Sequence, residues 1–350
     1  TLKALLAFDS IVGNLASPYD PGTAYVLMHH SLGEIMPKGS WGHAIGGMGS
    51  ISNAIATEAL NTGASIETNK TVTRLLVDDD SRVFGVEMSD GRQIHGRAIV
   101  SNINPKLLFS EFLEVSQIPE SFHKRMQRFK CVSGSFRMNV ALSELPDFSC
   151  FPGKNVEDHH GAGIILAPTM DYQHQALEDA NKNGWSTRPI VEMVIPSTLD
   201  NSLAPSGKHV ASLFCQHFLP NLPDNKMWDS CEEAASNSVI NLVSEFAPNF
   251  RKSIIAQKIL SPLELEQEFG LLGGDIFHGA LDLNQIWSSR PQLGHAAYRM
   301  PLKGLYLCGA GAHPGGGVTG IPGHNAAKEI LHDFRWWKKM GSINRFLTGE

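Results

Sequence analysis

A glycine-rich stretch near the end of the chain constrains the fold more than any other part of the sequence. From residue 304 to 331 it reads GLYLCGAGAHPGGGVTGIPGHNAAKEIL, which predicts a short apolar strand (305–308), a loop, and a helix that begins near Pro322. This order places unprotected backbone N–H groups and a helix N-terminus beside the loop, and both favour an anion or an electron-rich edge. The sequence therefore predicts a site for a ligand with phosphate or carbonyl oxygens.

The spacing of three of these glycines matches a dinucleotide-binding pattern but lacks its context. Gly315, Gly317 and Gly320 satisfy G-x-G-x-x-G. The fingerprint requires a turn directly after the strand and an acidic residue at the end of a following strand. Here residues 309–314 separate the strand from the motif, and no strand pattern follows the helix. We therefore reject a primary Rossmann site. A plain surface turn is also disfavoured, because strand, loop and helix follow in register.

Composition and charge narrow the class of protein. With 350 residues and 42% hydrophobic side chains, the chain can bury the cores of two lobes in an α/β or α+β protein. The net charge of −6 argues against nucleic acid as a partner. The five cysteines form no C-x-x-C pair, so we expect no zinc or other metal site and a reducing compartment, the cytoplasm or the mitochondrial matrix. Neither a signal peptide nor a transmembrane segment is evident.

Further patterns predict the elements between the ends of the chain. Four short β-branched runs, at 65–68, 71–77, 82–88 and 93–101, predict a β-meander with turns at DDDS and SDGR. The runs 189–195 and 209–217 predict two paired strands, and 230–246 predicts a helix. That helix would turn four side chains inward: Ala235, Val239, Leu242 and Val243. A first helix within 1–17 would bury a stripe formed by Leu5, Leu6, Phe8, Ile11 and Leu15.

The run LYLCGAGAHPGGGVTG resembles the C-terminal signature of the phytoene desaturase-like flavoproteins, which have the FAD-binding fold of the amine oxidases. A Gly-Gly-Met turn at 46–48 and the run from SPLELEQEF to Arg290-Pro291 are similar too, and SPYDPGTAYVLMHH points to one subgroup of that family. The resemblance implies FAD as the cofactor, with Val72 at the adenine. The residues that it places against FAD are Gly46, Gly47, Met48, Val72, Gly309, Gly311, Gly317, Val318, Thr319 and Gly320. A planar ring system close to main chain favours residues without a Cβ.

The same resemblance implies the fold class and the domain organisation. We expect an α/β protein with α+β lobes: an FAD/NAD(P)-binding fold of the amine oxidase and phytoene desaturase type, lacking its N-terminal βαβ unit, and a mixed-sheet substrate lobe. The expected division is a substrate-lobe segment (1–40), part of the FAD-binding domain (41–108), the substrate-binding lobe (109–290) and the end of the FAD-binding domain (291–350). Because no pyrophosphate-binding turn precedes Gly46, we expect a C-terminal fragment of a longer protein, in which FAD can be absent.

The function implied by the resemblance is that of an FAD-dependent oxidoreductase of the dehydrogenase or desaturase type, passing a hydride from a small apolar substrate to flavin. His278 and His313 are weak candidates for acid–base catalysis, and hydrogen bonding within their loops is the alternative. A non-catalytic binding or scaffold protein and a flavin-dependent isomerase are the alternative functions. The tail FRWWKKMGSINRFLTGE combines aromatic and basic residues, which suit peripheral membrane contact or a homo-oligomer interface. The alternative is that the tail is the solvated end of a packed helix.

Overall fold

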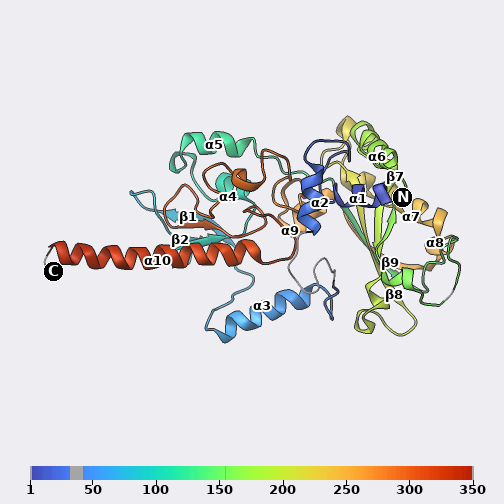
Figure 1. The fold of residues 1–350 in the computed structure, drawn as a ribbon, viewed down its shortest axis with the longest axis horizontal. Helices are drawn as coiled ribbons and strands as arrows, with labels where there is room; N and C mark the ends of the chain where they lie inside the picture. Colours follow the sequence, from blue (N-terminus) through green and yellow to red (C-terminus); the bar gives the residue numbers. More distant parts are fainter. Residues whose placement is uncertain (1, 32–41, 154, 349–350) are drawn as a thin grey trace. The chain divides into compact units, whose positions relative to one another are not determined.

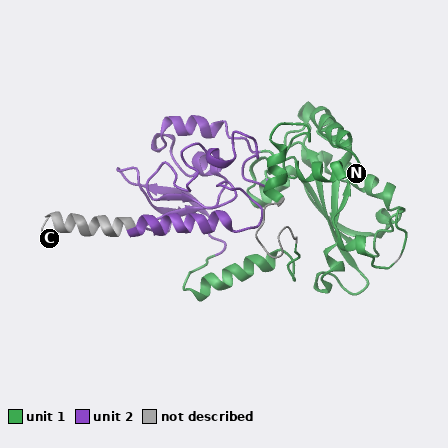
Figure 2. Ribbon diagram, viewed as in Figure 1, with its two compact units in different colours: residues 1–67, 132–275 green, residues 68–131, 276–350 purple. Residues whose placement is uncertain are grey.

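The computed structural model describes residues 2–31, 42–153 and 155–348 (Figure 1). Contacts within the chain define two compact units (Figure 2). Unit 1 comprises Thr1–Glu67 and Val132–Asp275, and unit 2 comprises Thr68–Cys131 and Ile276–Glu350. Each unit is described by itself below. The domain boundaries expected from the sequence stay a prediction.

A five-stranded sheet forms the centre of unit 1. Its strand order is β6-β7-β8-β5-β9. The strands are β5 (Phe136–Leu142), β6 (Ile164–Leu166), β7 (Trp185–Val194), β8 (His209–Phe218) and β9 (Ile254–Leu260). The predicted pairing of 189–195 with 209–217 is confirmed by β7 and β8, in which Met193 lies opposite Leu213. All four pairings are antiparallel, so this sheet is antiparallel where a mixed sheet was expected.

One face of this sheet is covered by α7 (Trp228–Phe246), the predicted helix. All four side chains expected to point inward are buried, and they pack with Met138, Val191 and Leu213 of the sheet. Even-numbered β5 residues and odd-numbered β7 and β8 residues face α7, because successive side chains of a strand alternate between its two faces. The other side chains of these strands therefore belong to the opposite face.

The remaining α-helices in the described part of unit 1 are α1 (Leu2–Asp9), α2 (Thr23–Ser31), α3 (Gly49–Asn61), α6 (Met170–Asn183), α8 (Phe250–Ser253) and α9 (Pro262–Phe269). Burial along these helices is less regular, and two of them, α6 and α9, begin at a side-chain cap. Ser261 and Glu264 form a reciprocal capping box that starts α9. The predicted N-terminal stripe is partly wrong, since Leu5 and Leu6 are 46% and 45% exposed while Phe8 is buried. Periodicity identifies a helix face but not which part of it another element covers.

Unit 2 contains two small sheets. β1 (Val72–Val77), β2 (Val83–Met88) and β3 (Gln93–His95) form an antiparallel sheet, whereas β4 (Ile99–Ser101) pairs in parallel with β10 (Leu305–Leu307). The meander is therefore confirmed for three strands only. The run at 65–68 is not a strand, and the run at 93–101 divides between the two sheets. A β-branched run becomes a strand only where another strand can pair with it.

Three α-helices lie in the described part of unit 2: α4 (Pro105–Glu111), α5 (Glu120–Gln127) and α10 (Ile321–Thr348). Its core joins Phe109 of α4 and Phe122 of α5 with Leu305 and Leu307 of β10. The predicted order of strand, glycine-rich loop and helix at the C-terminal end is confirmed. This core fixes the position of β10 and hence the start of the loop.

Candidate functional site

The glycine-rich loop begins where two parallel strands end together. In the pair of β4 with β10, Ser101 lies opposite Leu307, and the N–H of Cys308 donates to the carbonyl of Ser101 at 2.8 Å. The chain leaves both strands at the same edge, the place where open α/β sheets bind ligands. A Cβ on Gly309 would lie 2.5 Å from the carbonyl oxygen of Asn102. Glycine is therefore required there, because backbone atoms of the other segment occupy the space of a side chain.

Gly311 allows a second close approach in the same loop. A Cβ at this position would lie 2.4 Å from Cδ of Pro105 and 3.3 Å from the carbonyl oxygen of His278. Pro105 is the first residue of α4, which starts there because the Asn104 side chain accepts a hydrogen bond from the N–H of Lys106. Three segments therefore meet around the loop: the turn after β4, the turn at His278, and the chain after β10.

Arg290 is the hub of this assembly. Its side chain is fully buried, and its five N–H donors are all used. The acceptors are the backbone carbonyls of Phe277, Gly279, Gln285 and Ala310, at 2.7–3.2 Å. Arg290 thus binds the 277–285 segment to the glycine-rich loop. Lysine could not replace it, because an ammonium has three donors and lacks the planar fork.

His278 lies between these segments in an unusual backbone conformation. Its φ is +56°, in the left-handed region that non-glycine residues seldom adopt. The imidazole Nδ1 is buried and has no hydrogen-bond partner among the described residues. Burial lowers the pKa of His278 and the positive charge of Arg290 lowers it further, while a hydrogen bond with the Asn102 backbone opposes both. The imidazole is therefore neutral at pH 7.

The last part of the loop leads into α10 with its backbone exposed. Gly317, Val318 and Gly320 have φ values of +132°, +56° and +69°, and residues 317–320 are exposed. None of the hydrogen bonds among the described residues uses the N–H groups of 317–320. The Tyr298 hydroxyl donates to the carbonyl of His313 at 2.9 Å and accepts from the Asn325 side chain at 2.9 Å. This bridge fixes the loop to the first turns of the helix.

The other residues predicted to contact FAD belong to elements other than the glycine-rich loop. Val72 begins β1, an edge strand whose outer backbone groups the sheet does not use. Gly46, Gly47 and Met48 belong to unit 1 and precede α3. Gly46 and Gly47 have φ values of +84° and +83°, and the N–H of Gly46 donates to the carboxylate of Asp200 at 2.7 Å. That these residues line one flavin together with the glycine-rich loop stays a prediction.

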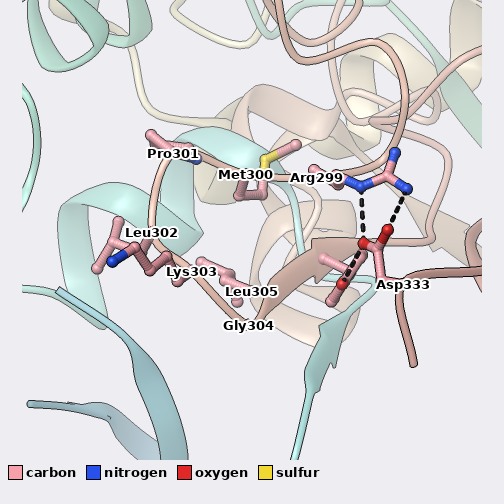
Figure 3. A pocket seen from close by; sticks show the side chains of 9 residues that line it. Arg299, Met300, Pro301, Leu302, Lys303, Gly304, Leu305 and Asp333 are labelled. Atoms are coloured by element: carbon pink, nitrogen blue, oxygen red, sulfur yellow. Dashed lines mark hydrogen bonds and ion pairs between the residues drawn. The ribbon is translucent and has the colours of Figure 1, made fainter. Parts of the chain in front are cut away.

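A second polar cluster holds α10 against β10. The Asp333 carboxylate accepts from the Arg299 guanidinium and from the Tyr306 hydroxyl, all at 2.7 Å (Figure 3). These bonds lower the pKa of Asp333 to about 2. Burial and the neighbouring Asp333 raise the pKa of Tyr306 to about 12. A cavity of about 240 Å³ lies beside the cluster, lined mainly by the 299–306 turn. Because these polar groups bind one another, the cluster stabilises the helix.

The aromatic and basic tail is only partly described. The Phe334 ring lies 4.1 Å from the guanidinium carbon of Arg97, so this ring packs within unit 2. The side chains from Trp336 onward lie outside the described part of the chain. No helix among the described residues is both long and apolar enough to cross a membrane. Within the same residues, no group of three or more His, Cys, Asp or Glu side chains could hold a metal ion.

The two units have the fold of the flavin-containing amine oxidoreductases. A solved oxidoreductase from Methanosarcina mazei has this fold, with a TM-score of 0.59 and 16% sequence identity over 94% of this chain and 64% of that one. The chain belongs to the flavin-containing amine oxidoreductase family, whose pattern matches residues 21–331. The predicted fold class and family are confirmed.

Curated relatives place the chain more closely within the family. It is 42% identical to pyridine nucleotide-disulfide oxidoreductase domain-containing protein 2 of Rattus norvegicus, over 95% of this chain and 58% of that protein. The subgroup expected from SPYDPGTAYVLMHH is thereby confirmed. The chain is also 24% identical to chloroplastic prolycopene isomerase 2 of an Oncidium hybrid, over 86% of this chain and 48% of the isomerase. It thus spans less than two thirds of the length of these relatives.

Proposed function

We propose that the chain is the part of an FAD-dependent oxidoreductase that holds the flavin end of the cofactor and binds an apolar substrate. The observation that carries this proposal is the edge where β4 and β10 end together, with close-packed glycines followed by the exposed residues 317–320 and the start of α10. No hydrogen bond among the described residues uses the N–H groups of 317–320. Membership of the flavin-containing amine oxidoreductase family supports it.

The residues of this edge fit a flavin. Gly309 and Gly311 bring the backbone segments together without side chains between them. The N–H groups of 317–320 and the positive end of the α10 dipole would stabilise the electron-rich edge of the ring system. FAD supplies the hydride acceptor when it is bound. From the resemblance, Val72 would contact the adenine, and Gly46, Gly47 and Met48 would approach the flavin.

The geometry also bears on the two candidate acid–base histidines. His278 is mainly neutral at pH 7, and its other ring nitrogen is bonded to the Asn102 backbone, so only Nδ1 is available to accept a proton. The backbone of His313 is held by Tyr298. Both residues stay candidates. Their other contribution in this proposal is to hold the loop in place, through the backbone carbonyl of His278 near Gly311 and that of His313 bonded to Tyr298.

FAD binding to the purified chain tests the proposal. Gly320 is a suitable probe because a Cβ there would meet nothing within 4 Å, so a larger side chain would occupy the space where the flavin is expected. Gly91 is a matched control, with the same open space and a similar φ of +79°. We expect Gly320→Val to weaken FAD binding at least tenfold in a fluorescence titration, and Gly91→Val to leave it unchanged. A chain that binds no FAD, or a Gly320→Val variant that binds it equally well, would contradict the proposal.

A flavin-dependent isomerase is the second candidate, favoured by the similarity to prolycopene isomerase. The two reactions differ in their electron balance, since only the oxidoreductase reaction leaves the flavin reduced by each substrate molecule converted. Anaerobic bleaching of the flavin in proportion to product would identify the oxidoreductase, and product without net bleaching the isomerase. A non-catalytic protein would bind FAD and give neither result.

A further inference from the structure

A charged group without a counter-ion among the described residues lies on the face of the five-stranded sheet opposite α7. Arg137 of β5 and Glu192 of β7 both lie directly opposite Phe214 of β8, which is between them. Residues opposite one another across neighbouring strands project to the same face. Phe214 therefore separates a guanidinium from a carboxylate on this face.

Arg137 is half-buried, yet few of its donors are used. One N–H of its guanidinium donates to the Ser212 hydroxyl at 3.0 Å, and the guanidinium carbon lies 5.6 Å from the centre of the Phe214 ring. Among the described residues, no carboxylate lies within 4.0 Å of it. Burial lowers the pKa of Arg137. Partly buried charges normally have a partner of opposite sign, because desolvation is costly.

The acid on the same face does not supply that partner. Burial raises the pKa of Glu192, and the negative charge of Asp9 raises it further, while Arg137 opposes both. Burial also raises the pKa of Asp9. These carboxyl groups would repel an anion carrying two charges. A ligand with one negative charge and an apolar body is compatible with them, and the Phe214 ring and the half-buried Val194, opposite Ser212, offer apolar contact.

We propose that Arg137 binds the carboxylate of an organic acid whose apolar part lies against Phe214. A planar guanidinium matches a carboxylate with two parallel hydrogen bonds, and such charge-assisted bonds are the strong ones. The site would give the lobe selectivity for apolar molecules that end in a carboxylate. This inference rests on the proposed function only in treating that acid as the substrate, because binding to unit 1 can be measured without FAD.

Isothermal titration calorimetry with matched pairs of ligands tests the proposal. The pairs are octanoate with octanamide and phenylacetate with phenylacetamide, which differ mainly in charge. We expect at least one acid to bind the chain about tenfold or more tightly than its amide, the ratio expected of a charge-assisted hydrogen bond. Arg137→Met should remove this preference, and Arg137→Lys should restore part of it. Arg188→Gln is the control, since Arg188 is an exposed arginine of β7 paired with Glu245 and should keep the preference.

Each outcome decides the matter. If no acid binds better than its amide, or if Arg137→Met keeps the preference while its circular dichroism spectrum matches the wild type, the proposal is overturned. If Arg137→Met fails to fold, the ratio for Arg137→Lys decides: an unchanged ratio contradicts the proposal and a reduced ratio supports it. A wild-type chain that binds no FAD would contradict the proposed function but leave these ratios unaffected, so the two proposals fail separately.

Discussion

Replacement of Gly309 by alanine tests how closely the two strand ends approach each other. The added Cβ would lie 2.5 Å from the oxygen, 2.9 Å from the Cα and 3.0 Å from the carbonyl carbon of Asn102, all backbone atoms that cannot rotate away. Ordinary contact requires about 3.5 Å, so one strand end must move by roughly 1 Å. Such a shift would break the 2.8 Å bond from Cys308 to Ser101. Overpacking costs about 1–3 kcal/mol and the lost bond about 1 kcal/mol, hence about 2–4 kcal/mol together.

Thermal unfolding followed by circular dichroism measures this cost. A loss of 1 kcal/mol lowers Tm by about 2–4 °C in a domain of roughly 150–250 residues. Gly309→Ala should therefore lower Tm by roughly 5–15 °C. Gly323→Ala is the matched control, because its Cβ would lie 4.0 Å from the nearest atom, the Cys308 carbonyl oxygen, within α10. Alanine in a helix is favoured over glycine by about 0.5–1 kcal/mol, so Tm should stay equal or rise. A Gly309→Ala variant that unfolds within about 1 °C of the wild type would refute the described approach of the strands.

Three further predictions concern the polar clusters of unit 2. Arg290→Lys should lower the free energy of unfolding, measured in urea, by about 3 kcal/mol or more, because lysine leaves buried carbonyls unpaired. A decrease below about 1 kcal/mol would contradict the role of Arg290 in joining these segments. Tyr298→Phe should lower the free energy of unfolding by about 1 kcal/mol and increase amide hydrogen exchange in the loop at His313. Unchanged exchange would argue against the bridge that the Tyr298 hydroxyl forms between His313 and Asn325. The pKa of Asp333 falls from 3.8 to about 2, so its stabilising effect is present above pH 4 and is lost as the pH falls toward 2. Tm of Asp333→Asn should therefore depend less on pH in that range than Tm of the wild type, and equal slopes would count against the ion pair with Arg299.

The sequence predicted the elements whose signals are local. The strand, glycine-rich loop and helix at the C-terminal end, the pair of β7 with β8, and the inward face of α7 follow from periodicity and from turn residues. The pairing of the other strands could not be predicted in this way. The run at 65–68 was expected to be a strand but is not one, and β4 pairs with β10 instead of continuing the meander.

The candidate site was predicted less completely for a similar reason. The glycines were recognisable, since close approach of backbone requires that residue type. Arg290 was noted only as part of a run that resembles the family, and Tyr298 was not noted at all. Their roles were missed because most of their partners are backbone carbonyls from other segments, and every residue has a carbonyl. The lone charge of Arg137 was missed because neighbours across strands are set by register, which the sequence does not show.

The pairing of β4 with β10 has a consequence for how the protein folds. Ile99 and Leu305 are joined by a loop of roughly two hundred residues, whose closure is entropically unfavourable and slow. The strands β5 to β9 all lie within residues 136–260 and can pair without the end of the chain. During synthesis the glycine-rich edge therefore forms after the intervening sheet, and strand β4 must wait for its partner. Conditions that slow completion of the chain should expose this step to misfolding before any other.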